Sequence, residues 1–247
     1  MEHSDAPDRT LASQLWLRPA ADRGHVDLGW LKSAHSFSFG NFYDPQYINF
    51  ESLRVINDDQ VVGGGGFPMH PHRNAEIFSY VLDGALSHKD TLGNGSTVKA
   101  GGVQYMSAGA GVRHSEYNPS DSETMRFLQI WLLPNVEDVP PRYDTMDIAP
   151  EDKDGKLKLF LSKDGRDGSM HIRADADIYA ATLNGDQQID FDLQPGQKGW
   201  VQVARGKLSV NGQELLRGDG LAIEDAGRLE FRSGDDADII FFALDQN

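Results

Sequence analysis

Short runs of apolar and β-branched residues, each ended within a few positions by a turn signal, constrain the fold of this chain most. In the first half these runs fall at 52–56, 76–82, 102–106 and 126–133. Turn-forming residues separate them: Asn57-Asp58-Asp59, Asp83-Gly84, Gly93-Asn94-Gly95 and Asn118-Pro119. A half-buried strand is also expected at 35–39, where serine and phenylalanine alternate. Long helical periodicity is missing, so the pattern predicts an all-β sandwich or barrel.

A second set of expected strands follows at 200–203, 207–210, 220–223 and 239–244, with a hairpin turn at Asn211-Gly212. Four prolines and a charge-rich stretch separate the two sets. The order of elements in the two halves is similar, which suggests a duplicated barrel. We therefore predict a disordered leader at 1–13, a metal-binding barrel at 14–135, a linker at 136–155 and a second barrel at 156–247.

Composition limits the expected binding partners and cellular location of the protein. The 23 basic and 38 acidic residues give a formal charge of -15, which repels phosphate backbones and argues against direct nucleic-acid binding. No apolar run approaches the roughly 18 residues of a spanning helix. The polar, acidic first residues do not resemble a signal peptide, so we expect no membrane contact and a cytoplasmic location.

Two pairs of potential metal ligands are the most informative motifs. Residues two apart on a strand point to the same face, so His70 and His72 can bind one ion, and His114 and Glu116 repeat that spacing. Because the chain has no cysteine, any metal site must use nitrogen and oxygen ligands. An isolated His-x-His is equally typical of an exposed polar strand face. The presence of a second pair favours the metal, as do the glycines before each pair and the prolines that stiffen the first.

Three segments resemble a known family. Gly64-x5-His70-x-His72-x3-Glu76 is similar to the first cupin motif, and Gly111-x2-His114-x3-Asn118 is similar to the second. More narrowly, HPHRNAEIFSYVLDG, MSAGAGVRHSEYN and HSFSFGNFYDP resemble the pirin family, including its bacterial members. The resemblance is strong over about 15–135 and loose beyond.

The resemblance implies a bicupin fold, two tandem antiparallel β-barrels of the jelly-roll type, with one metal held by His70, His72, His114 and Glu116. In cupins generally the ligand is the glutamate of the first motif, here Glu76, but seven residues rather than six separate it from Gly84. Glu76 is therefore expected to be a buried hydrogen-bonding group or a second-shell residue. The C-terminal barrel is expected to be degenerate and metal-free. Fe(II) is the first expectation, and Ni, Co, Mn, Cu and Zn suit the same ligands.

The family resemblance also implies a reaction: dioxygenation of a flavonol such as quercetin at its 2,3 bond, with O₂ and a small aromatic polyol as substrates. In this hypothesis Glu116 is the catalytic base as well as a ligand. The alternative is a metal-dependent protein-binding or transcriptional co-regulator module without essential turnover, which has a protein partner. A third hypothesis is a structural metal-binding protein with incidental activity. We expect a monomer.

Overall fold

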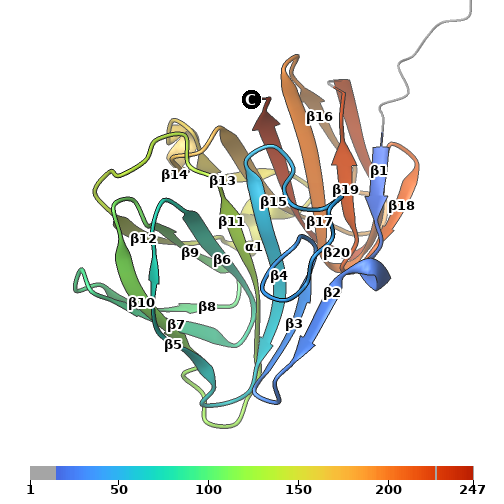
Figure 1. Cartoon of the computed structure of the whole chain (residues 1–247). Coiled ribbons are helices and arrows are strands. Elements are labelled where there is room, and N and C mark those ends of the chain that lie inside the picture. Colours follow the sequence, from blue (N-terminus) through green and yellow to red (C-terminus); the bar gives the residue numbers. More distant parts are fainter. Residues whose placement is uncertain (1–14, 226, 247) are drawn as a thin grey trace, which may run out of the picture.

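The computed structural model describes residues 15–225 and 227–246, most of them in strands (Figure 1). The expected leader at 1–13 lies outside these residues. Strand pairing is antiparallel except between β13 (Lys158–Ser162) and β14 (Met170–His171). The all-β fold is confirmed.

The first half of the chain forms two sheets. The larger is seven-stranded, in the order β12 (Arg142–Asp147), β9 (Gly102–Ser107), β6 (Glu76–Asp83), β11 (Met125–Leu132), β4 (Leu53–Val61), β3 (Leu31–His35) and β2 (Gly24–Asp27). The smaller is four-stranded, in the order β5 (Gly66–His72), β10 (Val112–Tyr117), β7 (Ala85–Asp90) and β8 (Gly95–Lys99).

The second half is built on one nine-stranded sheet. Its main path runs β1 (Leu15–Arg18), β19 (Gly220–Ile223), β17 (Gln197–Val210), β20 (Gly227–Asp245), β15 (Ala176–Leu183), β13 and β14. Two strands lie off this path: β16 (Ile189–Leu193) pairs with β20, and β18 (Gln213–Leu216) pairs with β17.

The two faces of the seven-stranded sheet have different roles, because successive side chains of a strand point to opposite faces. On β6, Phe78 and Tyr80 belong to a core that the sheet shares with the C-terminal half. Ser79, between them, faces the four-stranded sheet and contacts Glu116. One face of this sheet therefore provides the stability of the interface, and the other lines the predicted metal site.

Aromatic rings fill the shared core. Phe78 packs edge-on against Phe160 with ring centroids 5.6 Å apart, and Phe37 lies 4.9 Å from Trp200. All four side chains are 1% exposed or less. Fully buried aromatic side chains contribute much of the hydrophobic stabilisation of a core, so the C-terminal half supports the sheet that carries the site.

Strands cross between the predicted units at two places. β1, the first described strand, pairs with β19 in the C-terminal sheet, and Figure 1 shows it among the strands of that half. β12, inside the segment expected to be a linker, pairs with β9. The division into two barrels joined by a linker at 136–155 stays a prediction, and this segment also contributes to the N-terminal sheet.

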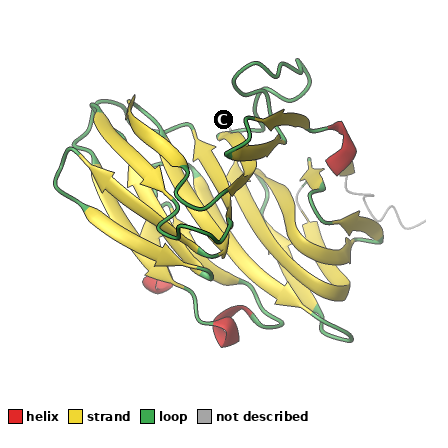
Figure 2. Ribbon diagram, turned by 90° about the horizontal axis from the view of Figure 1, so that it is seen from below, coloured by secondary structure: helices red, strands yellow, loops and turns green. Residues whose placement is uncertain are grey.

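The helices are short and peripheral (Figure 2). They are η1 (Ala20–Asp22), α1 (Pro150–Lys153) and η2 (Arg166–Gly168). Across 15–225 and 227–246, no helix has the length and apolar character needed to cross a bilayer.

Candidate metal centre

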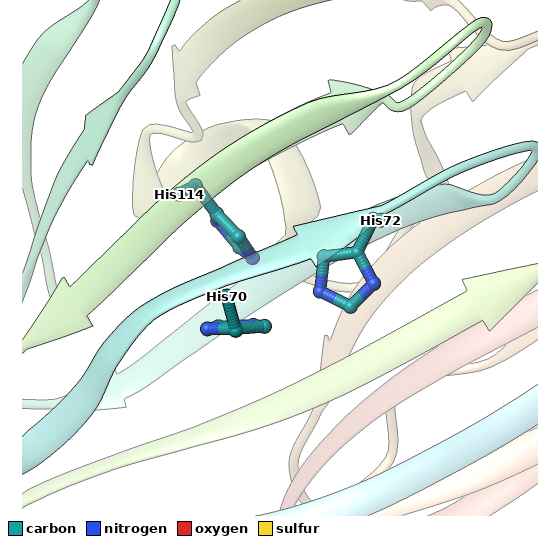
Figure 3. A group of neighbouring side chains, drawn as sticks. All are labelled: His70, His72 and His114. Carbon is teal, nitrogen blue, oxygen red and sulfur yellow. The ribbon is translucent and has the colours of Figure 1, made fainter.

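The three predicted histidine ligands come together on two adjacent strands. His70 and His72 lie on β5, and His114 lies on β10, paired directly with His70. Ring centroids are 4.5 Å apart for His70 and His114, 4.8 Å for His70 and His72, and 4.9 Å for His72 and His114. One nitrogen from each ring lies within 4.8 Å of the others. Figure 3 shows the three imidazoles around a common space.

Local sequence explains how β5 carries two of these rings. It is the edge strand of its sheet, where Pro68 and Pro71 are tolerated because an edge leaves backbone positions that need no N–H donor. Its first residue, Gly66, lies against the register shift between His114 and Glu116. A Cβ atom on Gly66 would be 2.4 Å from the Glu116 carbonyl oxygen, so only glycine allows this close approach.

Glu116 is fully buried beside the histidines. It offers a carboxylate oxygen within 4.8 Å of nitrogens of His114 and His88, which together form a second possible ligand group. Gln129 donates a 2.8 Å hydrogen bond to Glu116 Oε2, and Gln104 donates to Oε1. Ser79 lies 3.5 Å from Oε1. The carboxylate is thus held from the seven-stranded sheet while its own strand belongs to the opposite sheet.

Burial sets the protonation of these groups. Burial, together with the neighbouring histidines, lowers the pKa of His72 to about 4 and that of His114 to about 2. Both rings are therefore neutral, and their lone pairs are free for a metal at neutral pH. Burial raises the pKa of Glu116 to about 7, although hydrogen bonds from Gln129 and Gln104 oppose the shift.

The residues fit a divalent transition metal. His114 Nε2 is buried and has no hydrogen-bond partner, whereas Nδ1 of the same ring lies 3.4 Å from His88 Nδ1. A buried nitrogen without a partner is costly unless it binds something. Imidazoles with a carboxylate are the donor set that Fe, Ni, Co, Cu and Zn accept.

His88 and Asp90 are parts of the site that the sequence interpretation missed. His88 Nε2 lies 3.1 Å from Asp90 Oδ2, so hydrogen bonds connect Asp90 through His88 to His114. Burial lowers the pKa of His88, and Asp90 opposes this. The signal was present, because His88-x-Asp90 has the same two-residue spacing as His70-x-His72.

Tyr143, on β12, was also missed. Its ring stacks on His88 with centroids 4.0 Å apart, and its hydroxyl donates a 3.2 Å bond to Gln104 Oε1. That bond orients the Gln104 amide so that its NH₂ group faces Glu116. Tyr143 lies in the segment assigned to a linker, which is why its position gave no indication of a role.

Glu76 lies on the other face of its sheet. It is 1% exposed and accepts hydrogen bonds from Ser107 Oγ at 2.6 Å, from the Arg173 backbone N–H at 3.1 Å and from the Tyr105 hydroxyl. None of these partners is a predicted metal ligand. Glu76 is thus a buried hydrogen-bonding group that connects the two halves of the chain, and a role beside the metal stays a prediction.

A largely apolar cavity of about 500 Å³ opens beside the histidines. His70, His72 and Gln129 line it on the side of the metal centre. The apolar lining comes mainly from Leu28, Leu31, Phe39, Phe67, Met69 and Trp131. A cavity of this size suits a small planar molecule.

Comparisons with known proteins agree with this site. The sequence model of the pirin family matches residues 17–132, and that of the quercetinase C-terminal cupin domain matches 159–244. A protein of Escherichia coli (strain K12) named quercetin 2,3-dioxygenase is 42% identical over 230 residues, covering 93% of this chain and 98% of that protein. The chain belongs to the pirin family.

A solved structure and a second relative agree with this match. The crystal structure of the bacterial pirin YhhW from Escherichia coli in complex with nickel(II) is 42% identical to this chain, with a TM-score of 0.90. The structural match covers 94% of this chain and 100% of the YhhW chain. A pirin-like protein of Caulobacter vibrioides is 39% identical over 224 residues, which are 90% of this chain and 96% of that protein. The predicted family and cupin fold are confirmed.

Proposed function

We propose that this pirin is a metal-dependent dioxygenase that acts on flavonols such as quercetin and cleaves the 2,3 bond with O₂. The observation that carries the proposal is the meeting of three imidazoles beside a largely apolar cavity, with the buried Glu116 carboxylate close to the His114 ring. Relatives named quercetin 2,3-dioxygenase, 42% identical over most of the chain, support the same reaction.

His70, His72, His114 and Glu116 are the residues that would hold the metal. YhhW binds nickel(II), so a divalent transition metal is supported, and Fe(II) remains our first expectation beside Ni, Co, Mn, Cu and Zn. When bound, the metal supplies a positive charge that lowers the pKa of a coordinated hydroxyl group. The neutral state of His72 and His114 prepares the site for binding without prior loss of protons.

Glu116 would take the proton of the substrate hydroxyl. Its pKa of about 7 is close to the value at which a general base works best near neutral pH. Gln104 and Gln129 fix the carboxylate by donating one hydrogen bond to each oxygen. General-base assistance of this kind contributes about 10²- to 10⁴-fold in rate.

The cavity walls would position the substrate and exclude water. Phe39 and His72 each pack edge-on against Trp131, with ring centroids 5.6 and 4.8 Å apart, and this fixes the indole in the cavity wall. Flat apolar walls favour an aromatic ring over a sugar or a peptide. The open edge at β5 places the histidines where a ring hydroxyl can reach them.

The test is oxygen uptake by protein purified without air, analysed for metal and then reloaded with Fe(II) or Ni(II). We expect quercetin to disappear together with dissolved oxygen, and we expect neither change with His114→Ala. Uptake by the metal-free variant would place the chemistry elsewhere. If the loaded wild-type protein binds quercetin without consuming oxygen, the dioxygenase proposal is wrong, and the protein-binding alternative takes its place.

A further inference from the structure

Five buried polar atoms without a hydrogen-bond partner line the cavity next to the histidines. Buried polar groups are almost always paired, so unpaired ones gathered on one cavity call for an explanation. They belong to Ser33 Oγ, His35 Nδ1, Asn57 Oδ1, Asp59 Oδ1 and Trp131 Nε1.

Four of these residues form one compact patch on the seven-stranded sheet. Ser33 on β3 pairs with Asp59 on β4, and His35 pairs with Asn57 one rung along. The four side chains are between 2% and 5% exposed. We call Ser33, His35, Asn57 and Asp59 the polar block.

The polar block continues toward the metal centre. Asn57 pairs on its other side with Gln129 of β11, which also lines the cavity and donates to Glu116 Oε2 at 2.8 Å. The rung His35–Asn57–Gln129 therefore leads across the sheet to the carboxylate beside the histidines. The polar block lines the same cavity as His70 and His72. A ligand that reaches from these histidines into the cavity therefore meets the polar block.

Folding alone does not account for the polar block. Asp58, on the opposite face of the same strand, is fully paired: Arg126 donates to its two oxygens at 2.8 and 2.9 Å. On the cavity face, each unpaired polar atom lowers stability, whereas an apolar side chain of the same shape would not. Polar groups retained at such a cost are typical of functional sites.

The chemistry of the unpaired atoms limits the ligand. Trp131 Nε1 only donates hydrogen bonds, and Asn57 Oδ1 only accepts them. Burial raises the pKa of Asp59 to about 7, although the neighbouring Ser33 hydroxyl opposes the shift, and the charges of Asp58 and Glu116 add to it. The carboxyl group therefore both donates and accepts near neutral pH. The matching ligand has an apolar body and groups along one edge that donate and accept. Aromatic hydroxyl groups do both.

We propose that the polar block binds ring hydroxyl groups of an aromatic polyol other than the hydroxyl nearest His70 and His72, and thereby selects polyhydroxylated flavonols. The proposed function is the basis only for the chemical class of this ligand. The polar block acts on binding and specificity, and it has no part in the reaction at the metal.

The experiment compares quercetin with 3-hydroxyflavone, which keeps the 3-hydroxyl group and lacks the others. Binding is measured without air, so that no turnover occurs, on protein loaded with Ni(II). We expect Asn57→Leu and Asp59→Leu each to weaken quercetin binding about 5- to 10-fold, the effect of losing one or two hydrogen bonds. Binding of 3-hydroxyflavone should change by less than about 2-fold. Asp59→Ala, which removes both the donor and the acceptor, serves as a second variant if Asp59→Leu does not fold.

A matched serine pair gives the control. Ser52 is 3% exposed and its hydroxyl also lacks a partner, but unlike Ser33 it does not line the cavity. Ser33→Ala should weaken quercetin binding, and Ser52→Ala should leave it unchanged. Thermal melting of the ligand-free variants adds a second readout, because removing an unpaired polar group should leave the Tm unchanged or raise it.

The results separate this inference from the proposed function. Equal losses for quercetin and 3-hydroxyflavone, unchanged quercetin binding, or a lower Tm with no ligand discrimination would each overturn the proposal for the polar block. Hydroxyl-dependent binding in a protein that consumes no oxygen would support the polar block and reject only the dioxygenase reaction.

Discussion

The two halves of this chain fill their interiors with different chemistry. In the C-terminal half a separate core is built from apolar side chains such as Leu208, Leu215 and Phe241, all 1% exposed or less. Between the two N-terminal sheets the buried positions instead include Gln104 and Glu116. The N-terminal interior thus combines an apolar cluster, shared by β7, β8 and the seven-stranded sheet, with buried hydrogen-bonding groups, whereas the separate C-terminal core is hydrocarbon.

The difference shows which half of the chain supports the shared sheet and which half carries the groups that could hold a metal. The seven-stranded sheet packs one face into the core shared with the C-terminal half, and its other face carries polar groups beside a smaller apolar cluster. Among residues 15–225 and 227–246, the groups that could hold a metal all come from β5, β7 and β10. The C-terminal half therefore supports the sheet, and the groups that could hold a metal belong to the N-terminal sandwich.

Removing one imidazole should separate metal binding from folding. We expect His114→Ala to lose bound metal, because one of three converging nitrogens is gone, while its Tm in the absence of metal stays near that of the wild type. Metal analysis after gel filtration, with circular dichroism, measures both. His171→Ala, at an exposed histidine in the C-terminal half, is the control and should keep one metal per chain. A variant that unfolds would show that the imidazole supports the fold.

Truncating a core aromatic of the supporting half should have the reverse effect. Phe241 is fully buried and packs against Phe191 and Phe231. Phe241→Ala should lower the free energy of unfolding by about 3 to 5 kcal/mol, as measured by urea denaturation. The folded fraction should still bind one metal per chain. Leu216→Ala, at a side chain 51% exposed, should change stability by less than about 0.5 kcal/mol.

The two buried glutamates belong to different sheets and lie on opposite sides of the seven-stranded sheet, so together they test its two faces. Glu116→Gln should weaken metal binding by more than about 100-fold, since second-shell changes alone reach that size and an amide is a poorer ligand. Glu76→Gln should leave metal affinity within a few-fold, but lower stability by about 1.5 to 3 kcal/mol through weaker bonds to Ser107 and Arg173. Titration against a competing chelator and urea denaturation give the two numbers. The opposite ranking of metal affinities would make Glu76 the ligand.

Spacing was sufficient to predict the histidine cluster. Two-residue intervals placed His70 with His72 on one face, and the structure adds His114 from the adjacent strand of the same sheet. The runs at 76–82, 102–106 and 126–133 each fall in the strands β6, β9 and β11 with small differences at their ends. These predictions succeeded because strand periodicity and ligand spacing are local properties.

The polar block shows where local reasoning was wrong. Asn57-Asp58-Asp59 was interpreted as a turn because such residues favour turns, but all three lie inside β4. Polar residues are tolerated there because one face of the strand borders a cavity and the other face contacts Arg126. Neither neighbour can be inferred from a few consecutive residues of the sequence. The strand expected at 35–39 was also wrong: β3 covers Leu31–His35 and ends where the expected strand begins, and Phe37 packs against Trp200 of the other half.

A carboxyl group of the polar block should make stability depend on pH. Burial raises the pKa of Asp59 to about 7, so the carboxyl group keeps its proton in the folded state up to about that pH, whereas the ordinary pKa of an aspartate is 3.8. Its favourable contribution is therefore present below about pH 4 and is lost as pH rises through about 7. Asp59→Asn avoids this loss. Relative to wild type it should gain up to about 1.4 kcal/mol per pH unit between these values and nothing further above them.

This comparison is made by urea denaturation of metal-free protein at several pH values, so that metal binding does not contribute. A C-terminal core variant such as Phe241→Ala serves as the control, because its difference from wild type should not vary with pH over the same range. If the difference between Asp59→Asn and wild type is constant across pH, Asp59 is ionised in the folded state, and its contacts differ from those described here.

The smallest expected effect concerns Asp90, whose side chain reaches His114 only through His88. If His114 binds metal through Nε2, its Nδ1 carries a proton and donates to His88 Nδ1, and His88 Nε2 then donates to Asp90. Asp90→Asn weakens the last bond, so His114 is less firmly oriented and less basic. Loss of such a partner typically lowers metal affinity about 10- to 100-fold, and we expect the lower end because an asparagine oxygen still accepts. Chelator competition measures the affinity, and the visible spectrum of the Co(II)-loaded protein should shift as the ligand geometry changes.

The control is Asp27→Asn. It alters a similar turn contact, to the Gly29 N–H, and should change neither the metal affinity nor the spectrum. An unchanged affinity and spectrum for Asp90→Asn would mean that His88 and Asp90 only fill space beside the site, and that the polar interior of this half is less specialised than its contrast with the C-terminal core implies.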